Sequence, residues 1–257
     1  MKTHIIKFYF IFIEKIIVLL LNRNTKITHN NVNLEFYSPN FLCYYRSNTF
    51  STKEPETLEW IDSFEKDSVF WDIGANVGLY SIYAAKKNSM VYAFEPSFFN
   101  LEILVRNINQ NNLMSKIHVL PIALSDKSIL SEFRLTSIQW GGALSTFDKK
   151  YGYDGNNLNQ IFSYLTIGFK ADELLKILNL PNPDYIKLDV DGIEHLILSG
   201  AYSTLSKVKS ILIEISSGFH EQRDFCNNLL RKLGFNNVRN GEISGPAGTI
   251  NQIWERK

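Results

Sequence analysis

Two carboxylates, Asp72 and Glu95, each end a short apolar run, and their spacing could hold a nucleoside. Asp72 is followed by a turn that contains Gly74 and Gly78. Glycine lets the backbone bend sharply and lets a ligand approach it closely. Glu95 comes 21 residues after Gly74 (95 − 74), where an acid after the next strand can accept hydrogen bonds from both hydroxyls of a ribose. The pattern predicts a nucleoside site at the ends of two adjacent parallel strands.

The turn after Asp72 discriminates between two cofactors that contain a nucleoside. A dinucleotide with a pyrophosphate is bound by a Gly-x-Gly-x-x-Gly turn. Here Asn76 stands in place of the second glycine, and Gly74 and Gly78 are four residues apart. The Asp72 carboxylate would repel a pyrophosphate but attract an ammonium group. S-adenosylmethionine has an adenosine, a sulfonium and an ammonium and no phosphate, so electrostatics favours it over a nicotinamide dinucleotide.

A second group of polar side chains follows the apolar run Tyr185–Val190. Period-2 alternation puts Lys187, Asp189 and Asp191 on one side if the strand persists that far. Asp191 and His195 are four residues apart at the start of the next helix, and Glu214 ends the following strand. A base at this position could remove the proton of an acceptor hydroxyl. The candidate catalytic residues are therefore Asp189, Asp191, His195 and Glu214.

Other interpretations of this group stay open. Asp189, Asp191 and Glu194 could hold a divalent cation through oxygen ligands, although we do not favour a metal. Asp191 could instead cap the helix, with Glu194 completing a capping box. Lys187 could be the ion-pair partner of an acid at the strand end, and His195 could be a partly buried helix histidine.

Alternating strands and helices must position these residues within a domain at 69–257. The alternation predicts an α/β fold, a doubly wound Rossmann-like sheet that is mostly parallel and has seven strands. The last two strands would form a terminal hairpin. The predicted strands are Val69–Ile73, Met90–Phe94, Ile117–Ala123, Tyr185–Val190, Ser210–Ile215, Asn237–Arg239 and Gln252–Glu255.

The alternation breaks between the third and the fourth of these strands. Ile129–Leu135 and Ser163–Phe169 predict an inserted β-hairpin, joined by the polar segment 136–162. A connection of this length inside a compact domain is typically a lid or a binding loop. We expect 136–162 and the N-terminal segment to build the substrate pocket.

The N-terminus predicts a separate apolar, amphipathic helix at 1–30, followed by a segment at 31–68 that leads into the domain. Ile5–Leu21 is strongly apolar, but Glu14 and Lys15 stand near its middle. A charge there costs about 2.5–3.5 kcal/mol in a membrane-spanning helix, which disfavours a span. The same pair breaks the apolar stretch of a signal peptide. The helix is expected to pack against the domain or a partner, or else to lie in a membrane surface.

Net charge and cysteine content limit which binding partners and which compartment are expected. The formal net charge is +1, so bulk attraction to nucleic acid is not encoded and no nucleic acid partner is expected. Cys43 and Cys226 lie far apart without metal-type spacing and indicate reduced thiols in a cytoplasmic protein. If the N-terminal helix lies on lipid, the protein would be peripheral to the inner face of the membrane. The sequence indicates no oligomeric state.

The motifs at the strand ends resemble those of the FkbM-type S-adenosylmethionine-dependent methyltransferases. The resemblance runs from Val69 to about Phe235, and the order of the motifs makes it specific. One departure is Thr166–Asp172, where the family often has a Thr-Leu-Asp run; Asp172 keeps the acid. The motifs are DIGANVGLYS at 72–81, AFEP at 93–96 and IKLDVDGIE at 186–194, supported by ALSD at 123–126 and LILSG at 196–200.

The resemblance implies roles for individual residues toward S-adenosylmethionine. Gly74, Asn76 and Gly78 would lie under its methionine portion, and Glu95 would bind its ribose. Asn100 and the strand end at 123–124 would approach the adenine. The cofactor-binding candidates are Asp72, Gly74, Asn76, Gly78, Tyr80, Ser81, Glu95, Pro96, Asn100, Ala123 and Leu124.

The resemblance also implies a reaction, the transfer of a methyl group to a hydroxyl of a sugar, glycan or other polar metabolite. Methylation of amino groups in DNA bases typically shows Asn/Asp-Pro-Pro-aromatic after the fourth strand, where this chain reads Leu-Asp-Val-Asp-Gly. Two alternatives stay open. One is a nicotinamide-dependent oxidoreductase on the same architecture, against which Asp72 and the missing third glycine argue. The other is a non-catalytic interaction module that uses the apolar N-terminus as its contact.

Overall fold

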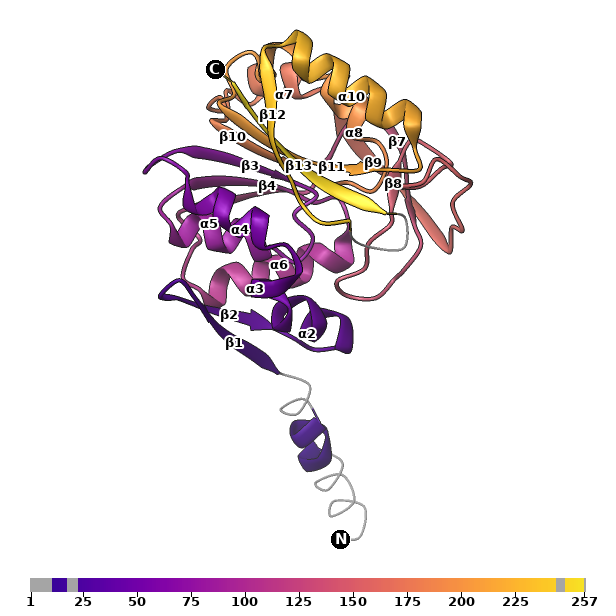
Figure 1. Ribbon diagram of the computed structural model, residues 1–257. Coiled ribbons are helices and arrows are strands. Elements are labelled where there is room, and N and C mark those ends of the chain that lie inside the picture. Colours follow the sequence, from indigo (N-terminus) through magenta and orange to yellow (C-terminus); the bar gives the residue numbers. More distant parts are fainter. Residues whose placement is uncertain (1–10, 18–22, 244–247, 257) are drawn as a thin grey trace, which may run out of the picture.

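A seven-stranded sheet forms the centre of the protein (Figure 1). The computed structural model describes residues 11–17, 23–243 and 248–256. Within them the strand order is β12-β13-β11-β10-β3-β4-β5. The pairs from β11 to β5 are parallel, whereas β13 runs antiparallel to both β11 and β12. The strands are β3 (Val69–Ile73), β4 (Met90–Phe94), β5 (Ile117–Leu120), β10 (Tyr185–Leu188), β11 (Ser210–Ser216), β12 (Phe235–Asn240) and β13 (Thr249–Arg256).

This topology confirms the predicted mostly parallel, doubly wound sheet with a terminal hairpin. The chain passes outward from β3 to β4 and β5 and then returns to β10 on the other side of β3. The strand order therefore reverses between β3 and β10, which is where open α/β sheets bind their ligands.

Helices cover both faces of the sheet (Figure 1). Alternation along β3 sends Phe70 into the core beneath α4 (Pro55–Asp62), α5 (Leu79–Lys86) and α6 (Phe98–Gln110). Trp71 points into the opposite core, which a second set of helices covers. These helices are α7 (Ala171–Ile177), α8 (Glu194–Ser199), α9 (Tyr202–Leu205) and α10 (His220–Lys232).

A second sheet of four strands, in the order β6-β9-β7-β8, is inserted between β5 and α7. Its strands β7 (Ile129–Leu135) and β9 (Phe162–Phe169) pair antiparallel, as predicted for the inserted hairpin. The predicted strand Ile117–Ala123 is wrong in its second half. β5 ends at Leu120 before Pro121, which cannot donate to a sheet ladder. The chain then enters β6 (Ala123–Leu124) of the second sheet, and β8 (Thr146–Phe147) was not predicted.

The N-terminal prediction is only partly right. Residues 11–17 form a helix and every one of them is exposed, so packing against this domain is wrong for them. Asn24–His29 is not helical but forms β1, which pairs with β2 (Val32–Tyr37). The turn between them is Asn30-Asn31, both with positive φ, as a two-residue hairpin turn requires. The rest of the predicted helix, 1–10 and 18–22, lies outside the described residues.

Two short helices complete the segment that leads into the domain. They are α2 (Phe41–Asn48) and α3 (Phe50–Lys53). The Asn40 side chain caps α2 by accepting a hydrogen bond from the Cys43 amide at 2.8 Å. Among the described residues, no helix has both the length and the hydrophobicity needed to span a bilayer.

Candidate active site

A cavity opens at the carboxyl ends of the parallel strands, at the point where the strand order reverses. The bend at 74–76 after β3 lines it, as does Glu95 after β4. The turn at 189–191 after β10 and Glu214 on β11 complete this side. The two groups that the sequence singled out, the glycine bend and the acid cluster, thus line one cavity.

Left-handed backbone shapes the bend after β3. Gly74, Asn76 and Gly78 have φ angles of 86°, 50° and 84°. A Cβ atom on Gly74 would lie 1.9 Å from the carbonyl oxygen of Asp189, so only glycine lets the ends of β3 and β10 come this close. A Cβ atom on Gly78 would lie 2.3 Å from Cδ1 of Leu104. Gly78 therefore serves the packing of α6 and does not line the cavity.

Glu95 lies at the predicted place and braces the bend. Its side chain is buried, its Oε2 accepts a hydrogen bond from the Asn76 amide at 2.7 Å, and its Oε1 accepts one from the Ser97 amide at 2.8 Å. Burial raises the pKa of Glu95 to about 7, against the lowering effect of these two amides. Each carboxylate oxygen has a further lone pair and can still accept a hydroxyl donor.

Asp72 corrects the sequence-based prediction. Its side chain is 1% exposed, does not line the cavity and accepts a hydrogen bond from Ser81 Oγ at 2.5 Å. Burial raises the pKa of Asp72, and the charge of Lys187 counteracts this. The physical reason is the strand alternation, which turns Asp72 toward α5 beneath the sheet. The predicted contact of Asp72 with a ligand ammonium is therefore wrong, and Ser81 is its buried partner.

The strand end at 123–124 is a second correction. Ala123 and Leu124 pair with Gly168 and Phe169 in the second sheet and do not line the cavity, because the chain leaves the central sheet after Leu120. The predicted cofactor residues that do line it are Gly74, Asn76, Tyr80, Glu95, Pro96 and Asn100.

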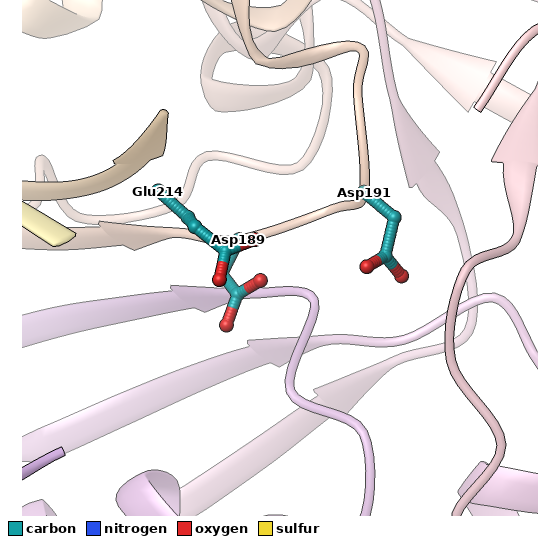
Figure 2. A group of neighbouring side chains, drawn as sticks. All are labelled: Asp189, Asp191 and Glu214. Atoms are coloured by element: carbon teal, nitrogen blue, oxygen red, sulfur yellow. The ribbon is translucent and has the colours of Figure 1, made fainter. Parts of the chain in front are cut away.

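Three acids converge at the other end of the cavity. Figure 2 shows Asp189 and Asp191 on the turn after β10 and Glu214 on the neighbouring strand. One carboxylate oxygen from each lies within 4.8 Å of the others. Lys187, which is 2% exposed, places its Nζ atom 2.6 Å from Asp189 Oδ2. Lys187 is therefore the ion-pair partner of Asp189, as one of the sequence interpretations had it.

The three acids differ in protonation. Burial disfavours the charged form of Asp189, but the Lys187 ammonium outweighs it and the pKa of Asp189 is lowered. Burial, and then the charge of Asp189, raises the pKa of Asp191 to about 6. Burial and the neighbouring acids raise the pKa of Glu214 well above its ordinary value. Lys187 thus favours the ionised form of Asp189, whereas burial and the neighbouring acids favour the protonated form of Glu214.

Asp191 holds a strained position. Its φ angle is 62°, a left-handed conformation that costs a non-glycine residue about 1–2 kcal/mol. Its Oδ2 accepts a hydrogen bond from the Leu144 amide at 2.6 Å, which ties the turn to the inserted segment. Helix α8 begins only at Glu194 and its N-cap residue makes no side-chain cap bond, so the helix-cap interpretation of Asp191 is wrong.

Glu194 and His195 lie behind the cavity and do not line it. The Glu194 carboxylate accepts hydrogen bonds from the Val190 and Gly192 amides, both at 3.0 Å, and from Gln222. The His195 ring contacts two phenylalanine rings on α10 and the loop before it. Because α8 starts after Asp191, the expected i,i+4 relation does not hold. The structure thus places His195 and Glu194 outside the cavity, which argues against the predicted catalytic role of His195 and metal-ligand role of Glu194.

The opposite wall comes from the two segments without a readable motif. Asn76 and Asn100 both donate through Nδ2 to the Gly142 carbonyl, at 2.8 and 3.1 Å. Asn100 Oδ1 also accepts a hydrogen bond from the Gly141 amide at 3.1 Å. Its amide group thus anchors the inserted segment beside the cavity. Segment 136–162, which the sequence analysis placed at the pocket, contributes Gly142, Ala143, Leu144, Ser145 and Tyr153. The lining residues before the domain that the sequence did not single out are Arg46, Thr49, Phe50, Lys53 and Glu54.

Fold and site together define a Rossmann-like α/β architecture, in which a glycine bend, a strand-end acid and a second acidic turn share one cavity. The chain belongs to the FkbM methyltransferase family, since residues 72–236 match the model of the methyltransferase FkbM domain. The matching family model is that of a methyltransferase domain and not of an oxidoreductase. Helices α2 and α3, with Arg46 and Lys53, precede the matched residues.

The chain is similar to one curated protein and to several solved structures. It is 27% identical over 158 residues to the hexuronic acid methyltransferase AglP of Haloferax volcanii. The match covers 62% of this chain and 60% of that protein. The methyltransferase FkbM from Methylobacillus flagellatus KT is 19% identical, with a TM-score of 0.49 over 83% of this chain and 53% of that one. The precorrin-6y C5,15-methyltransferase from Geobacter metallireducens GS-15 is 16% identical, with a TM-score of 0.48 over 79% and 86%.

Proposed function

We propose that this chain transfers the methyl group of S-adenosylmethionine to a hydroxyl group of a sugar, glycan or other polar metabolite. The observation that carries this proposal is the shared cavity. Glu95 lines one end and the acids Asp189, Asp191 and Glu214 line the other, across the bend at 74–76. The name of the similar Haloferax protein, a hexuronic acid methyltransferase, supports a sugar as acceptor.

The residues present fit the donor. Oδ1 of Asn76 is buried without a hydrogen-bond partner, and it stands in the bend where the methionine portion is expected. Glu95 has acceptor capacity left for the ribose hydroxyls, and the ionised Asp189 suits a positively charged ligand. The donor supplies an already activated methyl group. The chain then supplies position, which can contribute about 7–11 kcal/mol in favourable cases.

Asp189, Asp191 and Glu214 would have different roles toward the acceptor hydroxyl. Asp191 is our candidate for the general base, because its pKa of about 6 lies near neutral pH. Asp189, held ionised by Lys187, would orient the acceptor hydroxyl. Glu214, whose pKa is raised by burial and by the neighbouring acids, would form a hydrogen bond with the acceptor. A divalent cation is not favoured, because the Lys187 ammonium already binds Asp189.

Release of S-adenosylhomocysteine by the purified chain tests this function. The chain is incubated with S-adenosylmethionine and a panel of neutral and acidic sugars, with and without EDTA. We expect at least one sugar to stimulate release and EDTA to leave the rate unchanged. No binding of S-adenosylhomocysteine in calorimetry would contradict the donor assignment, and turnover that stops with EDTA would establish the metal instead. Donor binding without turnover on any sugar would favour the non-catalytic alternative.

We propose two further roles, one for the segment 136–162 and one for the N-terminal helix. The segment 136–162 acts as a lid over the acceptor, supported by the bonds that Asn76, Asn100 and Asp191 make to it. The N-terminal helix lies on the membrane surface and brings the site to a membrane-tethered acceptor, which the exposed apolar side chains of residues 11–17 support.

Cosedimentation with vesicles of phosphatidylglycerol and phosphatidylethanolamine tests the N-terminal helix. Phe12 and Ile16 are exposed apolar members of the helix at 11–17. The full chain is expected to pellet with the vesicles, and a Phe12→Asp, Ile16→Asp variant to remain in the supernatant, because an interfacial helix binds through its buried apolar face. Equal recovery of both proteins in the supernatant would contradict lipid binding.

A further inference from the structure

Two cations line the wall of the cavity that faces the acid cluster. Arg46 on α2 and Lys53 at the end of α3 are seven residues apart, with Thr49 and Phe50 lining the cavity between them. Both cations act electrostatically on Asp189. Burial and Lys187 have the largest effects on the pKa of Asp189, and the charges of Lys53 and Arg46 lower it further. This wall therefore lies close enough to the acid cluster to act on the same ligand.

The Arg46 guanidinium is held in place without being neutralised. Its Nε atom donates a hydrogen bond to the Gly141 carbonyl at 2.8 Å, which fixes the plane of the group. Its two terminal nitrogens make no further hydrogen bond or ion pair with the residues that the structure describes. A guanidinium has five N–H donors, and its terminal pair matches the two oxygens of a carboxylate.

Lys53 supplies a second positive charge on the same wall of the cavity. Its Nζ atom lies 2.7 Å from Glu54 Oε1, and its side chain is 44% exposed. Glu54 also accepts a hydrogen bond from Tyr80 and is therefore shared between several partners. Lys53 is thus partly compensated, whereas Arg46 keeps its donors for a ligand.

We propose that Arg46, assisted by Lys53, binds a carboxylate group of the acceptor, so that the substrate is an acidic sugar of the hexuronate class. The proposal rests on the proposed function and names its substrate class. The carboxylate would lie against the α2–α3 wall, and the sugar ring would present a hydroxyl to Asp189 and Asp191. Because Arg46 precedes the residues that match the family model, it would set the specificity of this chain rather than bind the donor.

The donor also has a carboxylate, and the experiment separates the two sources. Methyl β-D-glucuronide and methyl β-D-glucoside differ only at C6, which is a carboxylate in the first and a hydroxymethyl group in the second. Their affinities are measured by calorimetry on the full chain saturated with S-adenosylhomocysteine. The wild type is expected to prefer the glucuronide. Arg46→Gln should bind the glucuronide roughly tenfold to a hundredfold more weakly, as loss of charge-assisted hydrogen bonds implies, and the glucoside unchanged. Its affinity for S-adenosylhomocysteine should equal that of the wild type.

The controls give each outcome a meaning. Arg106→Gln removes a half-exposed arginine on α6 that pairs with Glu102 outside the cavity, and it should change neither sugar affinity. Equal weakening of both sugars in Arg46→Gln would show that Arg46 only anchors the Gly141 loop and would overturn the proposal. The proposal would also be overturned by a wild type that binds both sugars equally well, or by one that binds neither sugar. Weaker binding of S-adenosylhomocysteine would assign Arg46 to the donor carboxylate. A wild type that fails to bind S-adenosylhomocysteine would instead refute the proposed function itself.

Discussion

An Asp191→Asn variant is expected to lose about 10²–10⁴-fold in turnover, the range typical of a positioned general base. The amide keeps the size of the side chain and can still accept the hydrogen bond from the Leu144 amide, but it cannot take up a proton. Binding of S-adenosylhomocysteine should therefore stay at the wild-type affinity. Initial rates with a saturating acceptor and calorimetry with S-adenosylhomocysteine measure the two quantities.

The pKa of Asp191 also predicts how turnover depends on pH. Burial, and then the charge of Asp189, raises the pKa of Asp191 to about 6. A base acts only when it is deprotonated, so wild-type turnover should fall as the pH drops below about 6, and the residual rate of Asp191→Asn should lack this limb. Asp67→Asn is the matched control, because Asp67 is also left-handed, with φ of 60°, but is exposed outside the cavity. A variant at position 191 that kept the wild-type rate and acid limb would exclude Asp191 as the base.

The sheet could be predicted because its strands are apolar runs bounded by turns and helices. The strand ends at Glu95 and Asp189 followed from it, since parallel strands deliver their carboxyl ends to one edge. It was harder to predict which face of the sheet each strand-end side chain occupies. Asp72 also stands near a strand end, but it is paired in register with Lys187 on the face beneath α5. The alternation of β3, with Trp71 and Ile73 on the opposite face, contained this information.

Other parts of the site depended on local boundaries that periodicity does not fix. His195 would have faced Asp191 only in a helix that began at Asp191, whereas α8 begins at Glu194. The turn Asn30-Asn31 was a readable hairpin signal, because asparagine tolerates positive φ. Arg46 carried no such signal, since its place in the cavity arises from a tertiary contact with Gly141, 95 residues away. Long-range contacts of this kind have no local pattern.

Replacing Glu95 by Gln is expected to weaken the binding of S-adenosylhomocysteine by about 100-fold or more. The carboxylate accepts hydrogen bonds from the Asn76 and Ser97 amides, and a glutamine must turn its NH₂ group toward one of them. The variant therefore loses one bond that braces the bend and the charge that would accept the ribose hydroxyls. Bonds to a charged acceptor contribute about 1.5–3 kcal/mol each, so the loss of two such bonds lowers the affinity by about two orders of magnitude or more.

Glu194→Gln separates this loss of binding from a loss of stability. Burial raises the pKa of Glu194 to about 7 as well, and its carboxylate also accepts backbone amides, but it lies outside the cavity. Both variants should lower the melting temperature, and only Glu95→Gln should lower the affinity. Because the hydroxyls donate to the ionised form of Glu95, wild-type affinity should fall as the pH drops below about 7, whereas that of Glu95→Gln should stay flat. Equal affinity of Glu95→Gln and wild type at pH 8 would remove Glu95 from the donor site, since at that pH the wild-type carboxylate is ionised and makes its full contribution.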